Sequence, residues 1–278
     1  MILLHVAAAA LYALTVGALW PSPVAAAGGP PLASRATWGF WLLPAALLLH
    51  GWAVVQDTAT AQGLDFSLLN AISVVGALLA AVAWASGLLR TVPAIAAIIL
   101  PIAAAAVLLP ALLPRVSPAF ANAHRFAYGA ESFAALHVAV ALVSYAMFLV
   151  AAVLALVVMG LEKRLRQSVL EPSGSRVPPL LTLERFLFRL VTVGFVLLTV
   201  TLLSGMVFTE QLFGKPLTFT HKIVFSVLGW LTIGALLWGR WRYGWRGRVA
   251  LRWIIAGSLF VFLAYLGSKF VFEVLLGR

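Results

Sequence analysis

Long apolar runs separated by short polar segments dominate this sequence and restrict what it can fold into. Hydrocarbon offers no hydrogen-bond partners to a peptide backbone, so a chain that crosses a membrane must do so as helices or as a closed barrel. A spanning helix needs about 20 apolar residues, whereas barrel strands are shorter and alternate between apolar and polar residues. The sequence therefore predicts an all-α, polytopic membrane protein.

Eight apolar runs are long enough to form spanning helices. We expect these helices near residues 2–20, 38–55, 67–85, 93–113, 133–160, 186–208, 221–238 and 251–275. The whole chain, 1–278, is interpreted as a single transmembrane domain. Its longest polar segment, about 161–185, contains arginines, prolines, glycine and serine and is interpreted as a cytoplasmic linker.

The distribution of positive charge predicts the orientation, because Lys and Arg mark the cytoplasmic side of a membrane protein. The chain has 19 Lys and Arg residues against 8 Asp and Glu. With both termini outside, the inner loops hold most of these cations, and the outer segments hold only Arg115, Arg125, Lys215 and Arg278. We expect this orientation. The placement of Lys and Arg in cytoplasmic loops also explains the net charge of +11. No nucleic-acid partner is therefore expected.

The first apolar run, from Ile2 to Trp20, has two interpretations. The segment from Pro23 to Ala27 resembles a signal-peptidase site, but no Lys or Arg precedes the apolar run. The missing basic residues favour a first transmembrane helix with its N-terminus outside.

Several kinds of chemistry are excluded or have no visible basis. The chain contains no cysteine, so it forms neither disulfides nor thiolate metal sites nor thioether links to haem. It has no nucleophile elbow, phosphate-binding loop or metalloprotease pattern. We expect no enzymatic activity.

Five histidines are the candidate functional residues, and the expected topology places all of them at or near the outer face: His5, His50, His124, His137 and His221. His50 and His137 lie at similar depth on different helices, so together they are candidate ligands of one metal ion or of haem iron. A histidine near a helix end can equally bond to water or a lipid headgroup, and a proton relay is a further alternative.

Five further charged residues are interpreted as solvated or snorkelling charges. Asp57 and Asp65 flank a short outer loop, Glu210 follows the sixth span, and Lys269 with Glu273 forms an i, i+4 pair.

Four stretches resemble a known family: residues 47–52, 63–70, 136–146 and 221–268. The most specific is Leu136-His-Val-Ala-Val-Ala-Leu-Val-Ser-Tyr-Ala146. The chain resembles the membrane-embedded cytochrome c assembly proteins that handle haem, which include the CcsA, CcmC and HemX groups. It is most similar to the short, eight-helix, inner-membrane YpjD and HemX type.

The resemblance implies which histidines bind haem. A family histidine seven residues before Ser-Tyr-Ala is an external haem ligand, and here it is His137. Seven residues are almost two helical turns, so Ser144 should share a face with His137. His50 matches a family histidine in an early helix. The family's late external histidine and tryptophan-rich external loop are absent, and His221 is the candidate to replace one missing ligand.

The family thus implies a protein of the bacterial inner membrane that holds haem non-covalently near the outer face, for delivery or regulation. Expected partners are haem, membrane lipid and other cytochrome assembly proteins. Two alternatives stay open: a secondary transporter whose histidines relay protons, and an assembly or regulatory subunit without haem.

Overall fold

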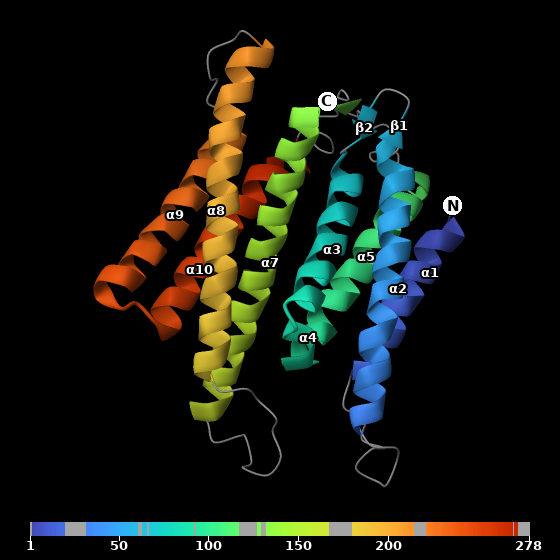
Figure 1. Ribbon diagram of the computed structural model, residues 1–278, viewed down its shortest axis with the longest axis horizontal. Coiled ribbons are helices and arrows are strands. Elements are labelled where there is room, and N and C mark those ends of the chain that lie inside the picture. The colour runs from blue at the N-terminus through green and yellow to red at the C-terminus, as the bar shows by residue number, and fades with distance from the viewer. Residues whose placement is uncertain are drawn as a thin grey trace. The chain divides into compact units, whose positions relative to one another are not determined.

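The computed structural model shows an all-α protein and confirms the predicted polytopic architecture (Figure 1). It describes residues 2–19, 32–60, 63–65, 67–91, 93–116, 127–128, 132–166, 180–213, 221–268 and 270–271. Within this part of the chain, seven helices are long and apolar enough to cross a membrane. An additional long helix, α2, contains the remaining predicted span. The orientation of the termini stays a prediction.

The helices follow the predicted apolar runs closely. They are α1 (Ile2–Leu19), α2 (Leu32–Thr58), α3 (Leu68–Ala85), the short α4 (Leu88–Thr91), α5 (Pro93–Val116), α7 (Ser132–Arg166), α8 (Leu180–Phe213), α9 (His221–Tyr243), α10 (Gly247–Phe262) and the π-helical turn η2 (Leu263–Gly267). Three short strands accompany them: β1 (Ala59–Thr60), β2 (Gly63–Asp65) and β3 (Ala127–Tyr128). β1 and β2 form an antiparallel pair in which Ala59 lies opposite Leu64.

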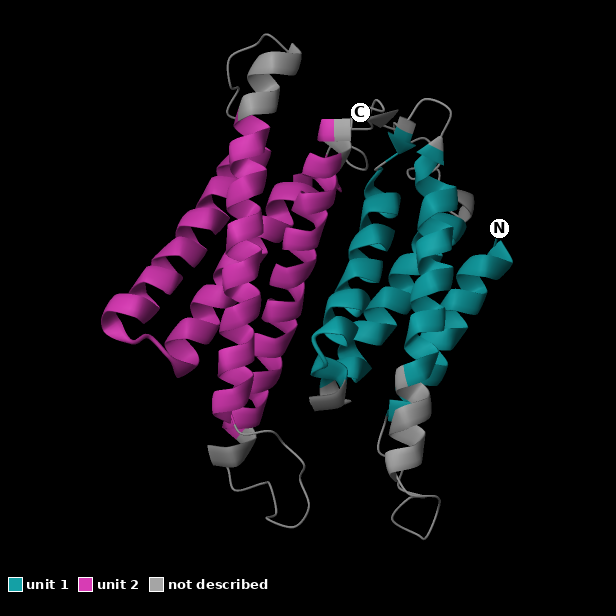
Figure 2. Cartoon of the chain, viewed as in Figure 1, with its two compact units in different colours: residues 1–127, 273–278 teal, residues 128–272 magenta. Residues whose placement is uncertain are grey.

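The chain divides into two compact units, which Figure 2 colours separately. The described residues up to Ala127 form unit 1, which contains α1 to α5. Those from Tyr128 onward form unit 2, which contains α7 to η2. That the whole chain acts as a single domain stays a prediction.

In unit 1, α1 packs against α2 and α5, and α3 packs against α5. The three helices α1, α2 and α5 meet at buried small and branched side chains, with Ala8, Ala53 and Val107 fully enclosed. Small residues let helix backbones approach closely, which is how helices associate in lipid. At Gly76 of α3 the approach is so close that a Cβ atom would overlap Ala106 of α5.

In unit 2, α7 packs against α8 and α10, and α9 packs against α10 and α8. Phe148 of α7 lies at the centre with 1% of its surface exposed. Gly194 of α8 gives its ring room, and the Ser258 hydroxyl of α10 donates to the Phe148 carbonyl oxygen at 3.1 Å. These contacts join α7, α8 and α10 around one residue.

Both helices that flank the predicted linker are longer than expected. α7 continues to Arg166 and α8 begins at Leu180, so helix covers both ends of the interval 161–185; the residues between them lie outside the described part of the chain. The apolar run that predicts each helix ends at the first charged residues. Glu, Lys and Arg are nevertheless good helix formers, so the helix continues beyond the apolar run into water. Glu162 and Glu184 also accept hydrogen bonds from arginines of α10 and α9.

The turn between α9 and α10 is tight and depends on glycine. Gly244 and Gly247 have φ angles of 67° and 58°, which residues with a Cβ atom rarely adopt. The backbone N–H of Trp245 donates to the Gly239 carbonyl oxygen at 3.4 Å, which folds the indole back over α9. The last span therefore begins at Gly247 rather than at residue 251.

The close approach at Gly76 yields a stability prediction. We expect Gly76→Ala to lower the free energy of unfolding by about 1–3 kcal/mol, because the added methyl group overpacks the contact between α3 and α5. Thermal unfolding of the purified protein in detergent measures this loss. Adding Ala106→Gly removes the overlapping methyl group and should recover most of the stability; an equal loss in the double variant would contradict the contact.

Candidate functional site

His50 lies at the centre of unit 1 and is completely buried, with 0% of its surface exposed. Its Nδ1 atom is 3.0 Å from the Tyr12 hydroxyl of α1, and its Nε2 atom is 3.2 Å from the Ser73 hydroxyl of α3. A neutral imidazole has one donor and one acceptor nitrogen, so these two hydroxyl groups satisfy it fully in either tautomer. The prediction of an interfacial histidine bonded to water is therefore wrong for His50.

A second polar pair, the buried His5 and the partly exposed Asp57, lies two helical turns along the same interface. The His5 Nε2–H donates to Asp57 Oδ2 at 2.8 Å, and the His5 side chain is 2% exposed. His5 and Tyr12 are seven residues apart on α1, as are His50 and Asp57 on α2. The antiparallel packing of α1 and α2 thus pairs them in register, and we call these two pairs the α1–α2 polar ladder.

Asn70 of α3 ties the Asp57 end of this ladder to the β-hairpin. Its amide nitrogen donates to the backbone carbonyl oxygens of Asp57, at 3.0 Å, and of Asp65, at 3.1 Å. The Asp65 carboxylate accepts the Ser67 backbone N–H at 2.9 Å and is 3% exposed. The prediction that Asp57 and Asp65 are solvated is wrong, because both carboxylates have partners inside the protein.

His137 lies in the first two turns of α7 and is half-buried in unit 2. Its Nδ1 atom is 2.8 Å from the Ser204 hydroxyl oxygen of α8. Ser204 donates its own hydrogen to the Thr201 carbonyl oxygen at 3.2 Å. A hydroxyl group has only one hydrogen, so when Ser204 directs it to the Thr201 carbonyl oxygen, Ser204 accepts from His137 and Nδ1 carries the proton. The lone pair of the imidazole is then on Nε2.

A glycine lies beside the Nε2 edge of this imidazole. A Cβ atom at Gly205 would come within 3.3 Å of His137 Cε1 and 4.0 Å of Nε2. Any larger residue at this position would crowd the edge of the ring that holds the lone pair.

Positive charge and aromatic rings surround the same end of unit 2. The Lys222 ammonium group lies 5.4 Å from the centre of the Tyr265 ring and close enough to His137 to act on it electrostatically. Tyr265 in turn contacts Tyr145, with 5.4 Å between the ring centres. An imidazole and an ammonium group thus occur together in a partly apolar setting.

The predicted shared face of His137 and Ser144 is confirmed. Ser144 is buried and donates to the Gly194 carbonyl oxygen of α8 at 3.0 Å, while His137 bonds to Ser204 of the same helix. His221 differs: it is the first residue of α9, is exposed, and makes no hydrogen bond within the described part of the chain.

The structure places the candidate ligands in different units, His50 in unit 1 and His137 with His221 in unit 2. Convergence of His50 and His137 on one iron stays a prediction. Over the described residues, no three His, Asp or Glu side chains gather as a bare metal ion requires. His124 and the pair Lys269 and Glu273 lie outside the described residues.

Sequence reasoning missed the hydroxyl partners Tyr12, Ser73 and Ser204. One signal was available for the first: the seven-residue spacing from His5 to Tyr12 repeats between His50 and Asp57, which suggests two polar stripes facing each other. Ser73 and Ser204 carry no such signal, because isolated serines are common in membrane helices.

Comparison with known proteins agrees with this architecture. The sequence model of the family described as Cytochrome C assembly protein matches residues 38–276. The inner membrane protein YpjD of Escherichia coli K12 is 36% identical over 135 residues, which cover 49% of this chain and 50% of that protein. The cytochrome c biogenesis protein CcsA of a Synechococcus strain is 28% identical over 158 residues, covering 49% and 52%.

The chain thus aligns with about half the length of each of these curated relatives. No solved structure is significantly similar to it. The family match covers most of the sequence, including His50, His137 and His221, and the described helices have the length and apolarity of membrane spans. This chain belongs to the cytochrome c assembly protein family and is a multi-pass membrane protein.

Proposed function

We propose that this protein binds haem non-covalently near the outer face of the bacterial inner membrane and holds or delivers it during cytochrome c assembly, without catalysing a reaction itself. The observation that carries the proposal is the hydrogen-bond relay from His137 through Ser204 to Thr201. In the arrangement in which Ser204 donates to Thr201, the lone pair is on Nε2, the nitrogen through which a histidine usually binds haem iron.

The surroundings of His137 suit this role. A hydrogen bond from Nδ1–H fixes the orientation of the ring and increases the basicity of Nε2. Gly205 leaves space at the ligating edge, and the Lys222 ammonium group provides a positive charge for a haem propionate. Bound haem would supply an iron centre that a histidine nitrogen can hold. Family membership and the biogenesis role in the name of CcsA support haem as the ligand.

His50 is proposed as a second ligand that becomes available only when its hydrogen bonds rearrange. Its longer bond, 3.2 Å from Nε2 to Ser73, is the one to give up, while Tyr12 keeps Nδ1 in place. His221 is exposed at the start of α9, one residue before Lys222, and is proposed as an auxiliary ligand. The inner-membrane location is inferred from the name of YpjD.

The first prediction concerns the iron ligand. Protein purified in detergent with haem should show a Soret absorption band, and His137→Ala should weaken or shift it because the axial nitrogen is lost. His5→Ala is the matched control, since it removes a buried histidine that bonds to Asp57 instead. A Soret band unchanged in His137→Ala would remove His137 from the site.

The second prediction tests the hydrogen-bond relay. Ser204→Ala leaves Nδ1 without its acceptor, and we expect haem affinity to fall about 10-fold, the usual size of such an effect on a ligating histidine. Ser204→Thr keeps the hydroxyl group and should retain most of the affinity. Haem titration followed by absorbance measures both. Equal affinity in Ser204→Ala and the unmodified protein would show that the relay is unimportant for binding.

The third prediction separates a ligand role of His50 from a structural one. If His50 binds iron through Nε2, Ser73→Ala should strengthen haem binding because the competing hydroxyl is removed, and His50→Ala should change the spin state seen by absorption or electron paramagnetic resonance. If His50 is structural, His50→Ala should leave the haem spectrum unchanged. It should still lower the free energy of unfolding by roughly 1–3 kcal/mol, since Tyr12 loses its partner.

The two alternatives give different results in the same preparations. An assembly subunit without haem would purify with no Soret band under any haem loading and would copurify with a membrane partner regardless of histidine substitutions. A secondary transporter would move a solute across vesicles while free of haem.

A further inference from the structure

One face of α8 changes character along its length. Residues that are exposed recur every three or four positions, so they lie on one stripe of the helix. The stripe begins with Leu181, continues with two exposed arginines and then becomes entirely apolar: Leu181, Arg185, Arg189, Val193, Val196, Val200 and Leu203. We call it the α8 stripe; it has a cationic end and an apolar extension.

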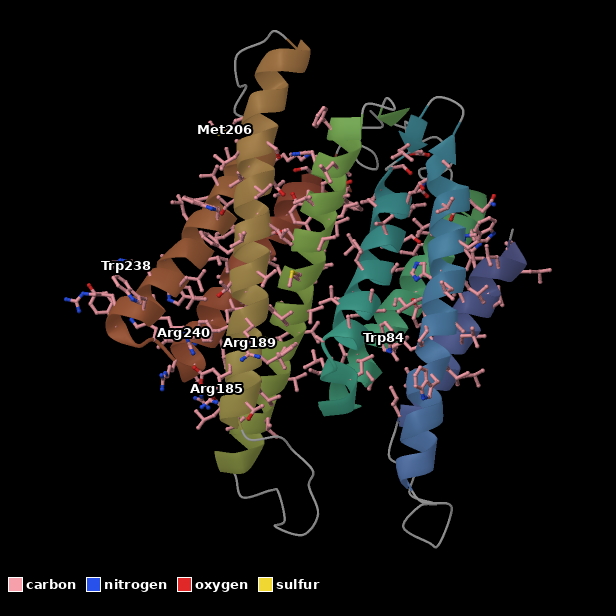
Figure 3. All side chains as sticks on the ribbon, viewed as in Figure 1. Trp84, Arg185, Arg189, Met206, Trp238 and Arg240 are labelled. Atoms are coloured by element: carbon pink, nitrogen blue, oxygen red, sulfur yellow. The ribbon has the colours of Figure 1, made fainter. Side chains whose placement is uncertain are left out.

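The two arginines of the stripe have no acidic partner within the described part of the chain. Glu184, their neighbour, accepts a hydrogen bond from Arg240 at 3.1 Å, and the Arg240 guanidinium also stacks on the Phe188 ring at 3.4 Å. Figure 3 shows Arg185, Arg189 and Arg240 at the same end of unit 2. The nearby carboxylate is therefore already bound by Arg240.

Arg185 and Arg189 are four residues apart, so their charges repel each other along the helix. An anion bound between them would convert this repulsion into attraction, and the planar guanidinium group forms strong paired hydrogen bonds with phosphate. Arg189 also lies inside the apolar span Leu180–Met206, and arginine side chains in such spans extend toward the headgroup region. The anion therefore has to be available at the membrane surface.

The apolar part of the stripe indicates what is attached to that anion. From Arg189 to Leu203 the helix rises about 21 Å. The hydrocarbon of one leaflet is about 15 Å thick, so an acyl chain can lie against the valines over its whole length. The exposed fractions of Val193, Val196 and Val200 are 48%, 55% and 48%, which leaves this surface open.

We propose that the α8 stripe is a binding site for an anionic glycerophospholipid. The phosphate diester lies between the guanidinium groups of Arg185 and Arg189, and one acyl chain runs along Val193, Val196 and Val200. This site is independent of the haem site and does not require it.

The test is native mass spectrometry of the full chain in neutral detergent, titrated with phosphatidylglycerol or with phosphatidylcholine. We expect a preference for phosphatidylglycerol that falls by roughly five-fold for each arginine removed, the usual contribution of a basic residue near an anionic membrane. Arg185→Gln with Arg189→Gln should abolish most of it. Replacing both with lysine should restore part of it, which shows that loss of charge and not misfolding is responsible.

The matched control removes two other exposed arginines of unit 2, Arg246 and Arg252. This variant loses the same charge and should keep the preference. An equal loss in both double variants would overturn the proposal, because the effect would then be general electrostatic attraction. Full competition by inorganic phosphate would also overturn the proposal, because the ligand would then be a soluble anion. Equal binding of both lipids would overturn it because the arginines would not select an anionic headgroup. A copurified protein that covers the stripe and excludes lipid would overturn it as well.

Discussion

The structure depends on the lack of hydrogen-bond partners in hydrocarbon, which favours pairing of the polar groups of a span inside the protein. Hydroxyl groups meet this requirement locally: Thr15 donates to the Leu11 carbonyl oxygen at 2.7 Å, and Thr232 to that of Leu228 at 2.7 Å. Imidazoles have two nitrogens and need partners on neighbouring helices. His50 and His137 are joined to hydroxyl groups and His5 to a carboxylate, all on neighbouring helices.

His50 and His137 illustrate how differently the same side chain can be set up. The Tyr12 and Ser73 hydroxyls occupy both nitrogens of His50, which makes it a structural centre until one bond opens. The Ser204 hydroxyl bonds to Nδ1 of His137 and is also 3.2 Å from the Thr201 carbonyl oxygen. The two residues, which carry equal weight from sequence alone, thus differ in the structure: both nitrogens of His50 bond to hydroxyl groups, and Nδ1 of His137 bonds to Ser204.

Much of the fold was accessible from sequence because apolar runs of the right length have few alternatives in a membrane. Helix ends were less accessible: α7 and α8 extend past the last apolar residue, where charged side chains continue the helix in water. In the site, helical periodicity placed His137 and Ser144 on one face correctly. It could not show that Asp57 bonds to His5 or that Ser204 bonds to His137, because such pairs form between helices whose rotation about their axes depends on the whole packing.

The α1–α2 polar ladder has a consequence for how the protein enters the membrane. Alone in lipid, α1 would expose His5 and Tyr12, and α2 would expose His50 and Asp57, each at a large desolvation cost. Paired, the two helices cancel most of these costs through the bonds at 2.8 Å and 3.0 Å. Entry of the two helices together, as one helical hairpin, therefore avoids the exposure of these polar groups to lipid.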